Sequence, residues 1–419
     1  MWPLMTRAAR VRYQLRCHDN GPVPKRFPPL LLPLILVTLT GHMAFSGGRV
    51  SGSLFALRVG SPELVVGLFM AMFSVLPTLA AMSIGRWIDR MGALPVLRFG
   101  VLMVLLGAWL PVLWLSVPSL FVMAVLVGFG FNAVSVASQH TVGAMAQGKS
   151  AEQRLRNFGW YALGHSASSA LGPFISGLLI DHVGFRAAFA TMAGFTCVAC
   201  YLVFRYLARL PAATQDDALA SAASKPRVWR DLLAAPELRR IYYVSMALAC
   251  TWDLFIVMLP VLGTRLGFSA SIIGTVFSLF ALGTFVSRAL MPWLSSRFRE
   301  WQIMRAAMAT IALVFVALPW AGAATVFMLL GFLFGTAIGF SQPNMLSLLH
   351  AAAPSGRGGE ALGLRSLVGN GSSVLIPITF GLAVGPLGVA PLLWGGAALI
   401  SSALPAAHRG VRQHAQKIS

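Results

Sequence analysis

Residues 85–92 read GRWIDRMG, a charged, glycine-rich octapeptide that separates two long apolar runs at about 63–83 and 96–117. Two arginines, an aspartate and two glycines within eight residues are typical of a turn rather than a buried segment. Each flanking run has about 20 residues, the length that crosses a hydrocarbon core roughly 30 Å thick at about 1.5 Å per residue. The octapeptide is therefore expected to be a short connection between two transmembrane helices.

The same alternation of apolar runs and polar breaks extends over the whole chain. Of 419 residues, 57% are hydrophobic and 11% are charged, whereas a soluble domain has about 25% charged residues. This composition excludes an ordinary soluble protein and predicts an all-α integral membrane protein. Twelve runs are predicted to span the membrane, at 30–57, 63–83, 96–117, 119–144, 158–180, 187–207, 240–262, 270–291, 303–321, 324–350, 363–383 and 390–406.

The basic residues indicate the orientation of these spans. Of the 32 lysines and arginines, three lie on the side opposite the termini (Arg58, Arg186 and Arg265) and two lie well inside spans (Arg49 and Arg288). The others lie in the termini, in the connections on the side of the termini, or at the ends of spans on that side. Because cytoplasmic loops carry the excess of Lys and Arg, both termini are predicted to be cytoplasmic. This distribution explains the net charge of +20 without nucleic acid as a partner. The excess of arginine over lysine favours a bacterial inner membrane.

A polar interval divides the spans into two groups of six. We predict a cytoplasmic N-terminal tail (1–28), an N-terminal six-helix half (29–207), a cytoplasmic linker (208–239), a C-terminal six-helix half (240–406) and a cytoplasmic C-terminal tail (407–419). The halves repeat each other, since RVGSPELVVG at 58–67 recurs as RLGFSASIIG at 265–274, and Pro173 and Gly177 match Pro377 and Gly381. Two parallel repeats predict a binding site near the bilayer midplane, between the halves.

GRWIDRMG resembles the signature Gly-x-x-x-Asp-Arg-x-Gly between helices 2 and 3 of the major facilitator superfamily, with Gly85, Asp89, Arg90 and Gly92 in the signature positions. Its counterpart in the second half, PWLSSRFR at 292–299, retains Arg297. The resemblance implies a secondary transporter that works by alternating access. It also implies that these five residues form a cytoplasmic gate, in which Asp89 meets the N-terminus of helix 11 while the cytoplasmic side is closed.

The fifth predicted span contains GHSASSALGPFISG at 164–177, in which Gly172, Pro173, Ser176 and Gly177 resemble the Gly-Pro-x-x-Gly-Gly pattern of the family's proton-coupled exporters. The resemblance favours export over uptake. Small residues at this spacing also let helices pack closely, whatever the direction of transport. The position that often carries an arginine in these exporters is Ala124 in this chain.

Ionisable side chains inside the spans point to a transport site. Asp253 is the one carboxylate well inside a predicted span, and Arg49 lies in the span that the repeat relates to it. Since such residues face a cavity or a partner, Asp253 is predicted to bind and release the coupled proton, and Arg49 to share its cavity. A direct ion pair between them is a further hypothesis, and a purely structural role is the alternative.

Other polar residues within spans complete the predicted site. They are His42 in the first span, Asn132 and Gln139 on one face of the fourth span, and Gln342 and Asn344 in the tenth. The amides either bind the solute or link helices by hydrogen bonds, and His42 either titrates or is simply packed. The sequence contains no evident metal cluster, nucleotide-binding loop or nucleophile–base pair, so neither a cofactor nor an enzymatic activity is expected.

The first hypothesis is proton-coupled export of a small organic or amphipathic compound across the lipid bilayer by a monomer. The alternative is proton-coupled uptake of an organic anion, with Arg49 as the clamp for its charged group.

Overall fold

The computed structural model describes residues 30–145, 151–207, 235–353 and 358–416. These residues form long α-helices in two groups, and the predicted all-α fold is confirmed. The N-terminal half contains α2 (Leu31–Arg58), α3 (Glu63–Met91), α4 (Ala93–Leu113), α5 (Val117–Met145), α6 (Ala151–His182) and α7 (Phe185–Arg205). The C-terminal half contains α10 (Pro236–Arg265), α11 (Ala270–Ser295), α12 (Glu300–Ala317), the short 3-10 helix η2 (Leu318–Trp320), α13 (Ala324–Ala352), α14 (Gly358–Leu387) and α15 (Val389–Gln416).

The described helices match the predicted spans in number, and several are longer. Eleven of the helices in the described ranges are long and apolar enough to cross a membrane. The twelfth, α6, begins with the polar segment AEQRLRN and also carries the polar run HSASS at 165–169 in its middle, which makes it less apolar than the others. Two helices extend beyond the predicted bounds of the C-terminal half. The first, α10, begins inside the predicted linker 208–239, and the last, α15, continues into the predicted tail 407–419. The predicted N-terminal tail 1–28 lies outside the described residues.

The octapeptide GRWIDRMG is not a loop, and that expectation was wrong. Residues 85–91 form the last two turns of α3, and α4 begins at Ala93. Gly92 alone connects the two helices, with φ +85°, a backbone conformation that costs glycine little. The charged residues of this stretch therefore extend α3 beyond the apolar run and do not interrupt the helix.

The predicted repeat is visible in the backbone. Gly60 and its counterpart Gly267 have φ of +79° and +75° in the turns that precede α3 and α11. Gly184 and its counterpart Gly388 also have positive φ, in the turns that precede α7 and α15. Equivalent turns in the two halves thus have the same handedness, as two copies of one six-helix unit require.

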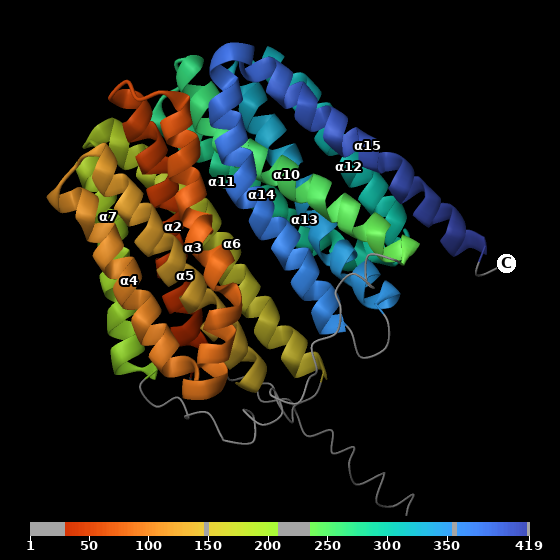
Figure 1. The fold of residues 1–419 in the computed structure, drawn as a ribbon, viewed down its shortest axis with the longest axis horizontal. Coiled ribbons are helices and arrows are strands. Elements are labelled where there is room, and N and C mark those ends of the chain that lie inside the picture. Colours follow the sequence, from red (N-terminus) through yellow and green to blue (C-terminus); the bar gives the residue numbers. More distant parts are fainter. Residues whose placement is uncertain (1–29, 146–150, 208–234, 354–357, 417–419) are drawn as a thin grey trace, which may run out of the picture.

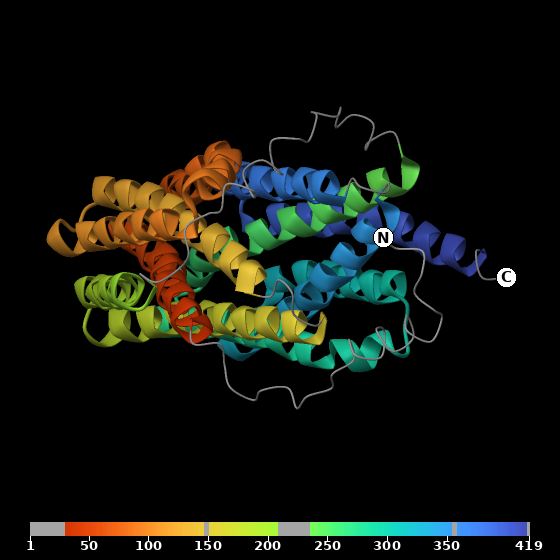
Figure 2. The same cartoon turned by 90° about the horizontal axis from the view of Figure 1, so that it is seen from below.

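The two halves contact each other through two equivalent helix pairs, α6 with α11 and α3 with α14. A Cβ atom on Gly274 would lie 2.5 Å from the carbonyl oxygen of Pro173, and one on Gly67 would collide with the carbonyl oxygen of Pro377. Because Gly274 and Pro173 are the repeat counterparts of Gly67 and Pro377, one contact geometry is used twice. Figures 1 and 2 show the halves side by side, and Figure 1 shows them meeting at one end and diverging towards the other.

Polar contacts reinforce the end at which the halves meet. The carboxylate of Asp181, at the end of α6, accepts hydrogen bonds from the first amides of α11, Ala270 N at 3.1 Å and Ser271 N at 2.7 Å. Arg265 and Glu63 form a salt bridge of 2.5 Å at the same end. Asp181 lies just beyond the predicted span 158–180. Burial raises the pKa of its carboxyl group, but the hydrogen bonds from Ser271 and Ala270 outweigh this effect and lower the pKa.

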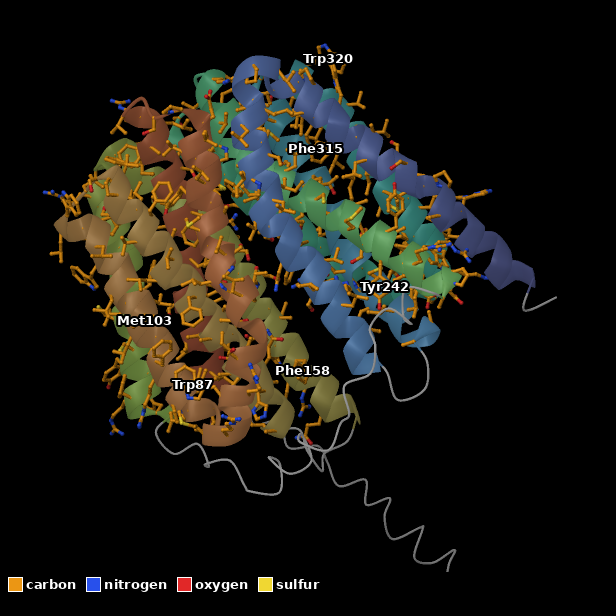
Figure 3. The ribbon with its side chains drawn as sticks, viewed as in Figure 1. Trp87, Met103, Phe158, Tyr242, Phe315 and Trp320 are labelled. Atoms are coloured by element: carbon orange, nitrogen blue, oxygen red, sulfur yellow. The ribbon has the colours of Figure 1, made fainter. Side chains whose placement is uncertain are left out.

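Apolar side chains fill each half and cover its outer surface. In the C-terminal half, the rings of Phe255 and Phe334 stack with centroids 4.4 Å apart, and Phe315 packs edge-on against Phe334. Trp320 is 69% exposed at one end of the molecule (Figure 3), where membrane proteins place tryptophan at the boundary between lipid and water. The helices therefore provide a rigid frame for polar groups between the halves.

Candidate functional site

Two adjoining cavities lie within the bundle. The first, which we call the central cavity, has a volume of about 340 Å³ and is lined by α2, α3 and α6 from one half and by α10, α11 and α13 from the other. The second, which we call the C-terminal chamber, has a volume of about 310 Å³ and lies between α10, α13 and α14. Trp252, Ile338 and Gln342 line both. The central cavity thus lies where the repeat predicts a site, between the halves.

Arg49 is a cation of the central cavity that forms no direct salt bridge among the described residues, although the charge of Asp253 in the adjoining chamber acts on it at longer range. Its guanidinium lies 5.6 and 5.8 Å from the ring centroids of Phe45 and Phe73, and its Nη2 is 3.8 Å from the sulfur of Met70. Its buried Nε has no hydrogen-bond partner. The salt bridge found among the described residues is the Glu63–Arg265 pair, so Arg49 has donors available for an anion.

Arg288 brings a second guanidinium to the central cavity from the opposite half. Its Nη1 donates to Ser166 Oγ at 2.5 Å and to the carbonyl oxygen of Ala162 at 3.4 Å, both on α6. A guanidinium carries five N–H donors, and these two contacts use only one of its nitrogen atoms. Arg288 therefore links the halves and adds a second positive charge to the cavity.

His42 and His165 lie against each other on the wall of the same cavity, with ring centroids 4.0 Å apart and planes tilted by 32°. Ser168 Oγ donates to the carbonyl oxygen of His165 at 2.7 Å and lies 2.8 Å from His42 Nδ1. Because a hydroxyl has one proton to donate, Ser168 donates either to the carbonyl oxygen of His165 or to His42 Nδ1, and the tautomer of His42 decides between them.

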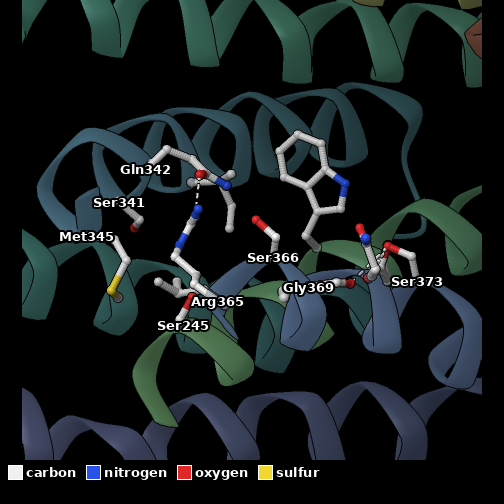
Figure 4. A pocket seen from close by; sticks show the side chains of 14 residues that line it. Ser245, Ser341, Gln342, Met345, Arg365, Ser366, Gly369 and Ser373 are labelled. Atoms are coloured by element: carbon white, nitrogen blue, oxygen red, sulfur yellow. Dashed lines mark hydrogen bonds between the residues drawn. The ribbon is translucent and has the colours of Figure 1, made fainter. Parts of the chain in front are cut away.

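Asp253 lies in the C-terminal chamber and is 5% exposed. Its Oδ2 is 2.6 Å from Ser372 Oγ, and its two oxygens are 3.0 and 3.1 Å from Ser373 Oγ. Both hydroxyls also reach the carbonyl oxygen of Gly369, at 2.8 and 3.3 Å. Each serine can donate to ionised Asp253, or can donate to Gly369 while it accepts from protonated Asp253. Figure 4 shows Ser373 and Gly369 next to each other in this chamber.

The other end of the C-terminal chamber is positively charged. Arg365 Nη2 donates to Gln342 Oε1 at 2.8 Å (Figure 4). Arg365 and Ser372 are seven residues apart on α14, which is two helical turns or about 10 Å. The chamber therefore has a cation near one end and the Asp253 carboxyl near the other, and Gln342 connects it to the central cavity.

The predicted site residues are only partly brought together. Arg49, His42 and Gln342 line the central cavity, and Asp253 lies in the adjoining chamber. The hypothesis of a direct Asp253–Arg49 ion pair is not met, since the Asp253 contacts are those with Ser372 and Ser373. The remaining amides lie elsewhere: Gln139 donates to Ser135 on α5, Asn344 donates to the carbonyl oxygen of Phe340, and Asn132 lines neither cavity.

The fifth-span motif has a packing role in this conformation. A Cβ atom on Gly172 would lie 2.9 Å from the carbonyl oxygen of Met43, and Gly177 lies against Ala270 at the start of α11. Ser176 is fully buried, and Pro173 lies against Gly274. These small residues let α6 approach α2 on one side and α11 on the other.

The predicted gate residues lie at the end where the halves diverge. A Cβ atom on Gly85 would meet nothing within 4 Å, so the Gly85 face of α3 is open, although Ile84 and Ile88 on other faces of the helix are buried. Arg90 is exposed, and Arg297 stacks on Trp293 at 4.5 Å from its ring centroid. The side chain of Asp89 lies outside the described part of the structure, so its predicted contact with helix 11 stays a prediction.

The site also contains residues that the sequence reasoning did not select: His165, Arg288, Arg365, Trp252, Ser372 and Ser373. Three of them carried a signal. Arg288 is charged inside a predicted span, and Ser372 and Ser373 belong to NGSS at 370–373, a polar run in an apolar helix. Trp252 gave none, because an apolar aromatic residue in a membrane helix is ordinary.

Comparison with known proteins supports this description. The family model described as Major Facilitator Superfamily matches residues 31–377. Among curated proteins, the human "Solute carrier family 67 member A1" is 27% identical over 288 residues, which cover 63% of this chain and 64% of that protein. The chain thus spans just under two thirds of the length of this relative.

Solved transporter structures share the fold. A mutant of the peptide transporter POT superimposes with a TM-score of 0.75 at 16% identity, covering 93% of this chain and 96% of the other. A mutant of the nucleoside transporter NupG gives a TM-score of 0.74 at 13% identity, covering 91% and 99%. Another POT family transporter, solved in complex with 5-aminolevulinic acid, gives 0.71 at 12% identity.

Proposed function

The chain belongs to the Major Facilitator Superfamily and is a transporter rather than an enzyme, and from that premise we propose that it is a proton-coupled secondary transporter of small organic anions. The observation that carries the proposal is the pair of guanidiniums, Arg49 and Arg288, in a cavity between the halves with no carboxylate among its lining residues. Cations desolvated in such a cavity favour a carboxylate or phosphate group.

Proton coupling is assigned to Asp253. The serine hydroxyls around it suit both protonation states, because Ser372 and Ser373 can turn between the carboxyl oxygens and the carbonyl oxygen of Gly369. A carboxyl group that keeps its hydrogen bonds when it gains a proton loses little hydrogen-bond free energy on protonation. Protonation would then change the charge of the C-terminal chamber, and with it the balance between the two open states.

The direction of transport is proposed as export, on the resemblance of the fifth-span motif to exporters. Uptake of an organic anion is the alternative, and the cationic cavity suits either direction. The proposal also includes the orientation: both termini lie in the cytoplasm, because the arginines and lysines gather on the side of the termini. It further takes the protein to be a bacterial inner-membrane protein that works as a monomer.

The anion preference is tested with purified protein in vesicles that carry a proton gradient. Arg49→Ala is expected to lower transport of small organic anions roughly tenfold or more, since a hydrogen bond to a charged group is lost, and to spare any neutral solutes that the protein carries. Arg186→Ala, which removes an exposed charge outside the cavity, is the control. Equal losses for anionic and neutral solutes would refute the clamp.

The coupling role of Asp253 is tested in the same vesicles. Asp253→Asn keeps the size and hydrogen-bonding capacity of the side chain but cannot ionise, so accumulation driven by the proton gradient should disappear. Exchange of labelled for unlabelled solute, which needs no net proton movement, should continue. Arg186→Ala, which lies outside both cavities, should retain gradient-driven accumulation. If Asp253→Asn accumulates solute as well as the wild type, another group carries the proton.

A further inference from the structure

A groove runs along the outside of the C-terminal half, between α12 and α15. It has a volume of about 730 Å³ and lies apart from both internal cavities. Its walls are one face of each helix, with residues three or four positions apart. They are Gln302, Arg305, Ala306 and Ala309 from α12, and Ser401, Leu404, Pro405 and His408 from α15.

Small side chains give the groove its depth. Ala306, Ala309 and Ser401 leave space between two helices that contact each other closely elsewhere. Pro405 has no amide hydrogen, so the carbonyl of Ser401, four residues earlier, lacks its helical donor. Ala306, Ser401 and Pro405 are exposed on the outer face of the bundle, where a membrane would surround it.

The polar group of the groove is a pair of side chains from the two helices. Arg305 Nη1 lies 3.2 Å from His408 Nδ1. Because a guanidinium can only donate, His408 Nδ1 is the acceptor, and the ring proton lies on Nε2. The remaining N–H groups of Arg305 and the Nε2–H of His408 are thus donors at one end of the groove.

The charge around this pair favours an anion at the membrane surface. Arg305 is five residues after the start of α12, about 8 Å along the helix. Arg297 and Arg299 lie in the turn before it. The nearby carboxylate, Glu300, accepts from Ser347 on α13 at 3.3 Å. This end of the bundle also holds the end of α15, and the basic residues assign it to the cytoplasm.

We propose that the α12–α15 groove is a binding site for an anionic glycerophospholipid, whose phosphate is held by Arg305 and His408 and whose acyl chain lies over Ala306 and Ala309. A basic pair between helices at the cytoplasmic surface recognises such headgroups, and the apolar floor beneath it distinguishes a lipid from a soluble phosphate. The site is independent of the transported solute.

The test uses the full-length protein in detergent, titrated with phosphatidylglycerol and observed by native mass spectrometry. The double variant Arg305→Ala/His408→Ala is expected to bind this lipid roughly tenfold more weakly. Arg239→Ala, which removes an exposed charge from the same end of the C-terminal half, should bind it as the wild type does. Ala309→Trp, which fills the groove without changing charge, should also lose binding, and it keeps the proposal testable if the double variant does not fold.

Three results would overturn the proposal. One is phosphatidylcholine binding as tightly as phosphatidylglycerol, since the headgroup charge would then not matter. A second is unchanged phosphatidylglycerol binding by the double variant or by Ala309→Trp. The third is displacement of the lipid by glycerol 3-phosphate at equal concentration, which would indicate a soluble phosphate ligand and not a lipid.

Discussion

Asp181 shows how one side chain holds the halves together at the end where they meet. Its carboxylate accepts from the first two amides of α11, groups that have no partner within the helix. The charge is also favourable next to the positive end of the helix dipole. A single residue of the N-terminal half thereby caps a helix of the other half.

This contact predicts a dependence on pH. The carboxyl pKa of Asp181 is lowered by its hydrogen bonds, against the effect of burial, so its stabilisation is fully present above its ordinary pKa of about 3.9. It is lost as pH falls through the lowered value. Because the side chain is exposed, screening limits the contribution to roughly 0.5–1 kcal/mol.

The measurement is the thermal unfolding temperature of the purified protein against pH. Asp181→Asn should unfold at a lower temperature than the wild type from neutral pH down to about pH 5, and the difference should shrink in more acidic buffer. A difference that stayed constant into strong acid would mean that the charge of Asp181 is not what stabilises the contact.

At the scale of elements, the contact between α6 and α11 depends on the absence of side chains. Gly274 lies against the carbonyl oxygen of Pro173, and the same contact recurs between α3 and α14. Small residues allow this approach, and the backbones cannot move apart without disturbing the other pair. The two crossings thus act together as the joint about which the halves would rock.

Gly274→Ala is expected to push α11 away from α6 and to destabilise the protein by about 1–3 kcal/mol, with slower transport. Gly194→Ala in α7 is the matched control, because a Cβ atom there meets nothing within 4 Å and alanine favours a helix. Unfolding temperature and transport rate are measured for both. Equal behaviour of the two variants would contradict a close-packed joint.

At the scale of the whole molecule, the halves meet at one end and diverge at the other (Figure 1). The salt bridge between Glu63 and Arg265 and the cap on α11 lie where they meet. The predicted gate residues of α3 lie at the other end, where a Cβ atom on Gly85 would meet nothing within 4 Å. This arrangement is one of the two states that alternating access requires.

Joining the halves at the closed end should therefore stop transport. Glu63→Cys and Arg265→Cys, in a background without other cysteines, are linked with a short bifunctional thiol reagent, and transport in vesicles should fall to background. The control is Glu63→Cys with Arg58→Cys, which links two residues of the same half and should leave transport intact. Full transport after complete cross-linking of the first pair would exclude rocking of the halves at this end.

The sequence alone determined the helical architecture, because the length and composition of each apolar run depend on local chain properties. The repeat of Gly60, Gly184 and their counterparts was equally readable, since a positive φ in a tight turn favours glycine at that position. The prediction from sequence failed at GRWIDRMG, where the charged residues suggested a loop. Arginine is a good helix former, so α3 continues through this stretch to Met91.

Only the tertiary structure decided which polar groups meet. Arg288, His165 and Ser166 reach the central cavity from α6 and α11, and Ser372 reaches Asp253 from α14. The two residues of each contacting pair, Arg288 with Ser166 and Ser372 with Asp253, are more than 100 positions apart in the sequence. Their contact depends on how helices from different parts of the chain pack. Helical periodicity gives the face on which a residue lies, but the partner of that face is fixed only when both halves are assembled.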